Sequence, residues 1–132
     1  MKSLLRVLRR FWMSFFLLCC GCVGTQVQQD VSLFESPETF VGREVELVGV
    51  LRFVPGNYNL FPTDNTKRDF EMGLCVPVGI AKSDVENVRL AESLNGRRVR
   101  LVGEMRDLVS REVVSTSFCK KTGVWVDRII PE

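Results

Sequence analysis

The chain has 132 residues, of which 45% are hydrophobic and 26% charged, a size and composition typical of one globular domain with a short leader. The net charge of +2 comes from the leader, because residues 1–22 hold four cations and no acid. The remaining residues hold 14 basic and 16 acidic side chains, and this slightly negative charge argues against a nucleic-acid interface. The chain contains no histidine, and this excludes Ser-His-Asp and Cys-His catalytic sites within it.

The first 22 residues have the layout of an export signal. Residues 1–10 are basic, residues 11–18 are apolar, and small or sulfur-bearing residues follow before the polar stretch "GTQVQQD". The apolar run of about 13 residues is shorter than the roughly 20 that a transmembrane helix needs. The pattern therefore favours export over a permanent membrane span.

The segment "FFLLCCGC" resembles the cleavage site of bacterial lipoprotein precursors, where an aliphatic residue and small residues precede an obligatory cysteine. The resemblance implies that this cysteine receives a diacylglyceryl group, becomes the new N-terminus after cleavage and is acylated again on its amine. Gly21 makes Cys22 the expected lipidated residue, although Cys19 stands where leucine is usual. Cys20, preceded by Leu17, is the alternative, and an ordinary signal peptide cleaved after Gly21 is another.

The same resemblance predicts how the chain is divided and where it is located. Residues 1–21 would be a signal peptide, 22–35 a lipid anchor and tether, and 36–132 the folded domain. Absence of Asp after Cys22 predicts sorting to the outer membrane, facing the periplasm. No cofactor is expected beyond the covalent lipid, and no metal site is indicated.

Two cysteines remain outside the leader, Cys75 and Cys119. An even pair in an oxidising compartment is expected to form one disulfide. Two separate buried thiols are the alternative.

An internal repeat is the most informative feature of the domain. The segments "GREVELVGVLR" at 42–52 and "GRRVRLVGEMR" at 96–106 share seven of eleven residues. Each begins with glycine and alternates apolar and charged residues, which predicts two strands. Gly49 and Gly103 lie inside them, and an interior glycine indicates a bulge or sharp bend. A short helical turn is predicted before the first segment, at 37–41.

The other predicted elements lie between and after these strands. Strands at 59–63 and 70–78 are expected to form a hairpin around a polar turn at 64–69. A helix follows, with Ser83 and Glu86 as a capping box and Asn95-Gly96 as its end. Its apolar face is predicted from Val85, Val88, Leu90 or Ala91, and Leu94. Strand character returns at 111–117 and at 124–130, where Trp125 is expected in or against the core.

The resulting order, β-β-β-α-β-β, resembles that of the OB-fold, and the resemblance covers about residues 36–131. It implies a mainly β domain with one helix, built as a five-stranded Greek-key barrel in which the first and fourth strands are neighbours. A small open sheet with one helix is the structural alternative.

OB-fold domains bind ligands on strands 2 and 3 and on the adjoining loops. Transferred by position, this predicts binding residues that combine aromatic rings with cations. They are Phe53, Asn57, Tyr58, Phe61, Lys67, Arg68 and Arg111. The competing interpretation is that Phe53 and Phe61 fill the barrel and that Lys67-Arg68 is a solvated turn. Asp64 and Asp69 resemble a calcium or acid-base pair, but carboxylates are expected in such a turn for backbone reasons alone.

These observations predict a lipid-anchored envelope protein whose barrel is a non-catalytic binding module for a protein, glycan or small ligand. The alternative is a structural accessory subunit of a larger envelope complex. An enzyme is not expected, because the sequence offers no recognisable acid-base set. Beyond the membrane, an envelope protein is the expected partner and nucleic acid is not.

Overall fold

A computed structural model describes residues 31–108, 113–114 and 119–132. The lipidation candidates Cys20 and Cys22 and the binding candidate Arg111 lie outside these residues. The elements in chain order are α1 (Ser32–Glu35), the 3₁₀ helix η1 (Pro37–Phe40), β1 (Glu44–Val54), β2 (Asn57–Phe61), α2 (Thr66–Glu71), β3 (Val76–Ala81), α3 (Val85–Ser93), β4 (Arg98–Asp107), β5 (Val113–Val114) and β6 (Thr122–Pro131).

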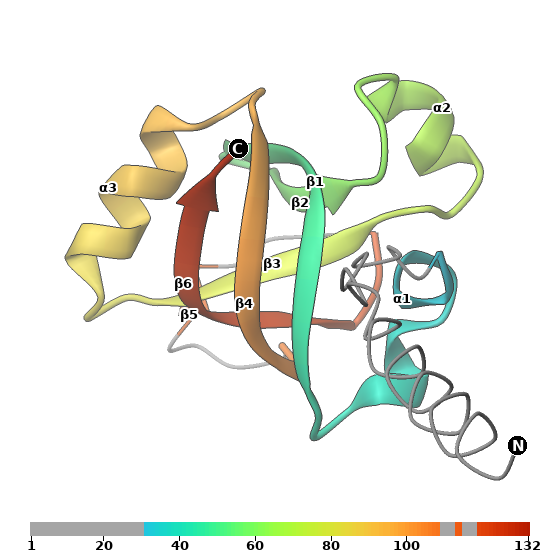
Figure 1. Cartoon of the computed structure of the whole chain (residues 1–132), viewed down its shortest axis with the longest axis horizontal. Helices are drawn as coiled ribbons and strands as arrows, with labels where there is room; N and C mark the ends of the chain where they lie inside the picture. Colours follow the sequence, from blue (N-terminus) through green and yellow to red (C-terminus); the bar gives the residue numbers. More distant parts are fainter. Residues whose placement is uncertain (1–30, 109–112, 115–118) are drawn as a thin grey trace, which may run out of the picture.

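Five strands form a closed barrel in the order β2-β1-β4-β6-β3, and pairing of β2 with β3 completes the circle. The β3–β6 pair is parallel and the others are antiparallel, while the short β5 adds to β3. Helix α3 connects β3 to β4, as in OB-folds, and lies on the opposite side of the barrel from α2 (Figure 1). The predicted fold class is confirmed, and closure of the barrel excludes the open sheet.

The two repeated segments pair with each other. Strands β1 and β4 are antiparallel, and Leu47 lies opposite Leu101, its equivalent in the repeat. The repeat therefore forms a local twofold. Both interior glycines lie where a neighbouring backbone comes close: a Cβ on Gly49 would overlap the carbonyl of Phe61, and one on Gly103 that of Trp125. The β4–β6 register also shifts beside Gly103, which confirms the predicted irregularity.

Gly103→Ala is expected to destabilise the barrel by about 1–3 kcal/mol, because the new methyl group must displace the backbone of β6. Urea denaturation followed by circular dichroism measures the effect. Gly49→Ala should act in the same direction at the β2 side, since its Cβ would also meet a carbonyl. Unchanged stability in both variants would contradict the close-approach role of these glycines.

The segment between β2 and β3 differs from the prediction. Residues 66–71 form α2, where we expected a turn and the start of a strand, and β2 makes its hairpin with β1. The side chain of Asn65 caps the helix by accepting a hydrogen bond from the backbone N–H of Arg68 at 3.3 Å. The buried carboxylate of Asp69 accepts hydrogen bonds from the N–H and hydroxyl of Thr63, at 2.9 and 2.7 Å. These bonds favour a helical turn over a hairpin.

Helix α3 is present, but its capping residue is Asp84 and not Ser83. The Asp84 carboxylate accepts a hydrogen bond from the N–H of Asn87 at 3.2 Å. Ala91 and Leu94 are buried as predicted, whereas Val85 is 52% exposed. The predicted stop is confirmed, because the helix ends before a glycine with φ of 80°.

The folded domain includes residues before position 36. Residues 32–35 form α1, and its Phe34 is fully buried in the barrel core. The ammonium group of Lys120 donates hydrogen bonds to the carbonyls of Phe34, Glu35 (3.1 Å) and Gly73 (2.7 Å). Burial lowers the pKa of Lys120, an effect opposed by the nearby carboxylates of Glu38 and Glu35. The described end of the expected tether is therefore part of the folded domain.

The expected disulfide is present, joining Cys75 to Cys119 with their Cα atoms 6.4 Å apart. Cys75 is the residue before β3, and Cys119 precedes Lys120 in the segment that leads to β6. The bridge therefore joins the segment before β6 to the segment before β3, where Lys120 also bonds the carbonyl of Gly73.

Candidate ligand-binding groove

A groove of about 640 Å³ lies between β2 and α2. The strand contributes one side and the helix the other, so segments that follow each other in sequence form the whole site. Its lining residues are Gly56, Asn57, Asn59, Phe61, Thr66, Lys67, Phe70 and Glu71.

The alternation of β2 decides which of its side chains enter the groove. Successive residues of a strand point to opposite faces, and Asn57, Asn59 and Phe61 share the face that lines the groove. Tyr58 and Leu60 point the other way: Leu60 belongs to the barrel core, and the half-buried Tyr58 packs against that core. The amide of Asn59 donates a hydrogen bond to the side-chain oxygen of Asn57 at 2.8 Å, which fixes two amide groups side by side.

Some of the predicted binding residues line the groove, and others lie elsewhere. Asn57, Phe61 and Lys67 line the groove. Tyr58 packs against Phe53 inside the barrel, with ring centroids 4.5 Å apart. Arg68 is exposed on α2 and is not among the lining residues. The structure thus brings part of the predicted set together at one groove, while Phe53 belongs to the core and the half-buried Tyr58 packs against it.

Five lining residues were not predicted: Gly56, Asn59, Thr66, Phe70 and Glu71. Asn59 could have been found from strand alternation, since it lies two residues from Asn57. Phe70 and Glu71 had no such signal, because the stretch that contains them was expected to be a strand. Phe70 is 52% exposed, so its ring borders both the groove and the solvent.

The groove combines three kinds of group. The half-buried amide of Asn57 offers hydrogen-bonding atoms, and Phe70 offers an exposed aromatic face. Asn59 and Phe61 are 3% and 1% exposed, so they form the floor of the groove, and Phe61 fills the barrel as the competing interpretation expected. Lys67 and Glu71 lie four residues apart on α2 and add one positive and one negative charge. Such a surface suits a polar ligand that also has an apolar face.

The carboxylates considered as a calcium or acid-base pair do not converge. Asp69 is buried and bonded to Thr63, whereas Asp64 is exposed and lines a different cavity. Across the described ranges, no group of three or more potential ligand residues is placed to hold a metal ion. The structure therefore assigns Asp69 a part in holding α2 in place.

The fold and the groove define the class of protein: a small OB-like β-barrel with a surface groove beside its second strand. No known protein-family model matches the chain, and no curated protein matches it either. Within residues 31–108, 113–114 and 119–132, no helix is long and apolar enough to cross a bilayer.

Proposed function

We propose that the protein is a lipid-anchored component of the cell envelope whose barrel is a non-catalytic binding module. The observation that carries the proposal is the groove between β2 and α2, with its amide pair, one exposed aromatic ring and two opposite charges. Of the protein, glycan and small ligands considered, the lining best suits a glycan, because sugars present hydroxyl groups to amides and C–H faces to aromatic rings.

The non-catalytic part of the proposal is supported by the roles of the acidic residues near the groove. Asp69 is buried in hydrogen bonds to Thr63, which leaves Glu71 as the carboxylate that lines the groove. Hydrolysis of a glycosidic bond ordinarily uses two carboxylates that flank the bond. The groove is therefore better suited to holding a ligand than to transforming it.

Site-specific crosslinking tests the binding site. The photoreactive p-benzoylphenylalanine replaces Phe70 at the groove, and in a control it replaces Val85 on α3; both native side chains are 52% exposed. Irradiation of intact cells should give a discrete adduct at position 70 and none at position 85. Mass spectrometry of the adduct then identifies it as glycan, small molecule or protein. Equal labelling at the two positions, or no adduct at either, would refute the groove as the binding site.

A substitution at the same position tests the groove without crosslinking. Phe70→Glu should abolish ligand retention while the melting temperature stays close to that of the wild type, because the ring is half exposed. Val85→Glu, the matched apolar-to-acid change, should keep the ligand.

The anchor is supported by the resemblance of "LLCCGC" to lipoprotein cleavage sites. The intact mass of the mature protein tests it separately. A chain that begins at Cys22 and carries acyl chains supports the anchor, and one that begins at Cys20 supports the alternative site. An unmodified N-terminus would overturn it, with no consequence for the groove.

The accessory-subunit alternative is favoured by one observation. Phe70 and Met72 are 52% and 64% exposed at the end of α2, and exposed apolar side chains close together are typical of protein-protein contacts. A protein adduct at position 70, together with a complex that Met72→Glu also disrupts, would favour this function over glycan binding.

A further inference from the structure

We propose a second binding site, for a ligand with linked phosphoryl groups, at the end of the barrel where β4 begins. Its cations are Arg52, Arg97 and Arg98, none of which lines the groove beside α2. It is formed by two segments that lie about 45 residues apart in sequence and meet through the pairing of β1 with β4. The proposal stands independently of the glycan groove and of the lipid anchor.

The backbone fixes these arginines close together. The N–H of Leu51 bonds the carbonyl of Arg97 at 2.9 Å, and the N–H of Gly96 bonds the carbonyl of Leu51 at 2.7 Å. Arg52 follows directly in β1, and its Nη1 lies 3.5 Å from the position that a Cβ would occupy on Gly96. Its guanidinium group therefore reaches over the turn that leads into Arg97 and Arg98.

Two hollows adjoin this turn, and Gly96 and Arg98 line both. One, of about 350 Å³, extends toward the C-terminal residues Pro131 and Glu132. The other, of about 480 Å³, extends toward the loop at Thr63 and Asp64. Arg98 thus lies between two adjoining spaces and is placed to contact groups held in either.

The three arginines differ from Arg100, the next basic residue of β4. Arg100 pairs with Glu46 at 2.6 Å and with Glu132 at 2.9 Å, and these hydrogen bonds raise its pKa. Glu132 is therefore already matched by a cation. Among the described residues, Arg52, Arg97 and Arg98 form no ion pair within 4 Å, and their charge remains for a ligand.

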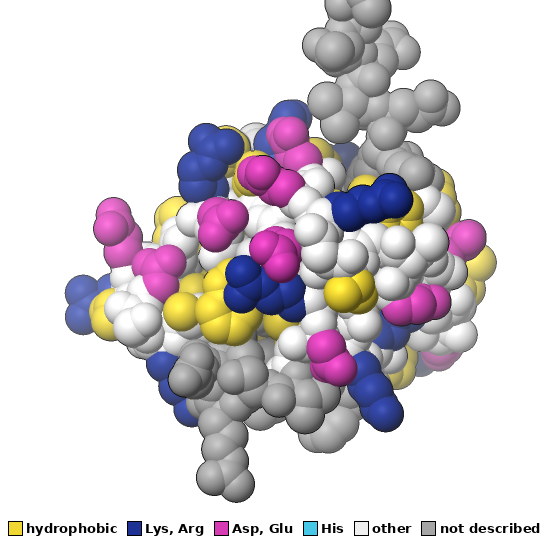
Figure 2. Space-filling model, turned by 90° about the horizontal axis from the view of Figure 1, so that it is seen from below, with side chains coloured by type: hydrophobic (Ala, Val, Ile, Leu, Met, Phe, Trp, Pro, Cys, Tyr) yellow, Lys and Arg dark blue, Asp and Glu magenta, His cyan; other side chains and the backbone are white. Residues whose placement is uncertain are grey.

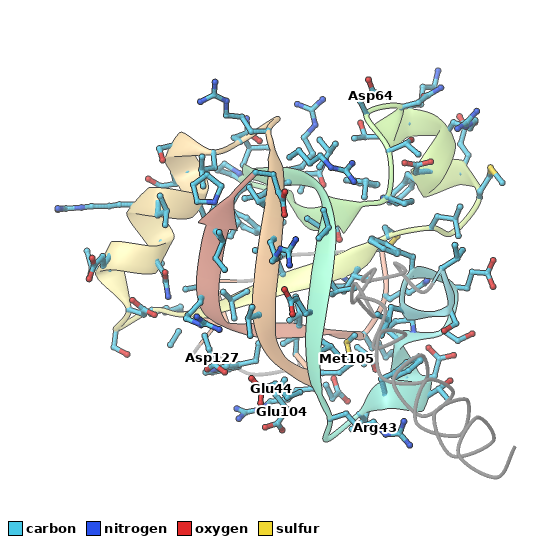
Figure 3. All side chains as sticks on the ribbon, in the orientation of Figure 1. Arg43, Glu44, Asp64, Glu104, Met105 and Asp127 are labelled. Atoms are coloured by element: carbon cyan, nitrogen blue, oxygen red, sulfur yellow. A yellow bond between two sulfur atoms is a disulfide. The ribbon has the colours of Figure 1, made fainter. Side chains whose placement is uncertain are left out.

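Carboxylates lie at both ends of the barrel. Glu44 and Glu104 lie together at one end of the β1–β4 pair, and Asp64 lies at the opposite end of the molecule (Figure 3). The face that carries the first end shows acidic and basic side chains interspersed (Figure 2), and Glu104 there pairs with Arg106 at 3.1 Å. Asp64 lines the larger hollow and forms no ion pair among the described residues, whereas Glu132, which lines the other hollow, is paired with Arg100.

The use of arginine indicates the chemistry of the ligand. A guanidinium group donates two parallel hydrogen bonds to phosphate oxygens, and it stays charged at any physiological pH. Arg97 lines one hollow and Arg98 lines both, while Arg52 lies beside the turn at Gly96 that adjoins them. Three guanidinium groups in this arrangement match two or three linked phosphoryl groups better than a single one. The site therefore fits a diphosphate or triphosphate moiety.

Calorimetric titration of the mature protein in detergent micelles with inorganic tripolyphosphate tests the proposal. At low ionic strength the wild type should bind, and Arg98→Ala should weaken binding by about tenfold or more through loss of a charge-assisted contact. Asp64→Asn should strengthen binding, because it removes a repelling carboxylate. Arg43→Ala, the control at the opposite end, should leave the affinity unchanged.

Several results would overturn the site. They are no heat of binding, equal loss in Arg98→Ala and Arg43→Ala, or citrate binding as tightly as tripolyphosphate, which would indicate a general attraction for anions. Melting curves show whether each variant is folded. Phe70→Glu should bind tripolyphosphate as the wild type does, so failure of the glycan groove and failure of this site give different results.

Discussion

Removal of the disulfide between Cys75 and Cys119 is expected to lower the free energy of unfolding by about 4 kcal/mol. The bridge closes a loop with a sequence separation of 44, and the chain-entropy relation gives about this value for such a loop. Loosening the bridge also affects Lys120, which follows Cys119 and bonds carbonyls of α1 and of Gly73. The Cys75→Ser/Cys119→Ser variant, compared with the wild type by urea denaturation, measures the loss.

The same experiment has an internal control. Reductant should bring the wild type close to the double variant, and it should leave the double variant itself unchanged. Hydrogen exchange adds a local reading: because α1 is held partly through Lys120, amides of residues 32–36 should lose protection in the reduced protein. A wild type whose unfolding midpoint does not respond to reductant would contradict the expected stabilisation.

The elements predicted correctly are those that a short stretch of sequence is enough to indicate. The repeated segments alternate apolar and charged residues, and the turn glycines Gly42 and Gly96 have positive φ in the structure. Helix α2 was missed because six residues are too few to show an apolar stripe. What holds it is the hydrogen bonding of Asp69 to Thr63, a contact that exists only once the chain has turned back.

The residues of the groove were predicted only in part, for a different reason. Its predicted residues were chosen by chemical type, and Tyr58 and Phe61 are three positions apart, a spacing that places them on opposite faces of any regular strand. Strand alternation applied from Asn57 and Phe61 would have put Asn59 in the predicted set in place of Tyr58. The arginine site could not be predicted in this way, because Arg52 and Arg98 meet only through the register of β1 with β4.

Phe34→Ala is expected to destabilise the domain by about 3–5 kcal/mol, the range for truncating a fully buried aromatic side chain. The sequence placed this residue in a tether, because "SLFE" is too short to show a helical pattern. In the structure its ring has no solvent exposure, and its carbonyl accepts a hydrogen bond from Lys120. A large effect would show that the domain depends on residues before 36. Urea denaturation measures it.

Val31 provides the matched control, since it lies just before α1 and is 54% exposed. Val31→Ala should change stability by no more than about 0.5 kcal/mol, as expected for a surface substitution. If Phe34→Ala were equally mild, α1 would be dispensable and residues up to 35 would serve as a tether. If only Phe34→Ala is severe, a tether between the proposed lipidation site at Cys22 and the barrel would be at most residues 23–31. Binding in the groove would then take place close to the membrane surface, because an extended chain of that length spans about 30 Å.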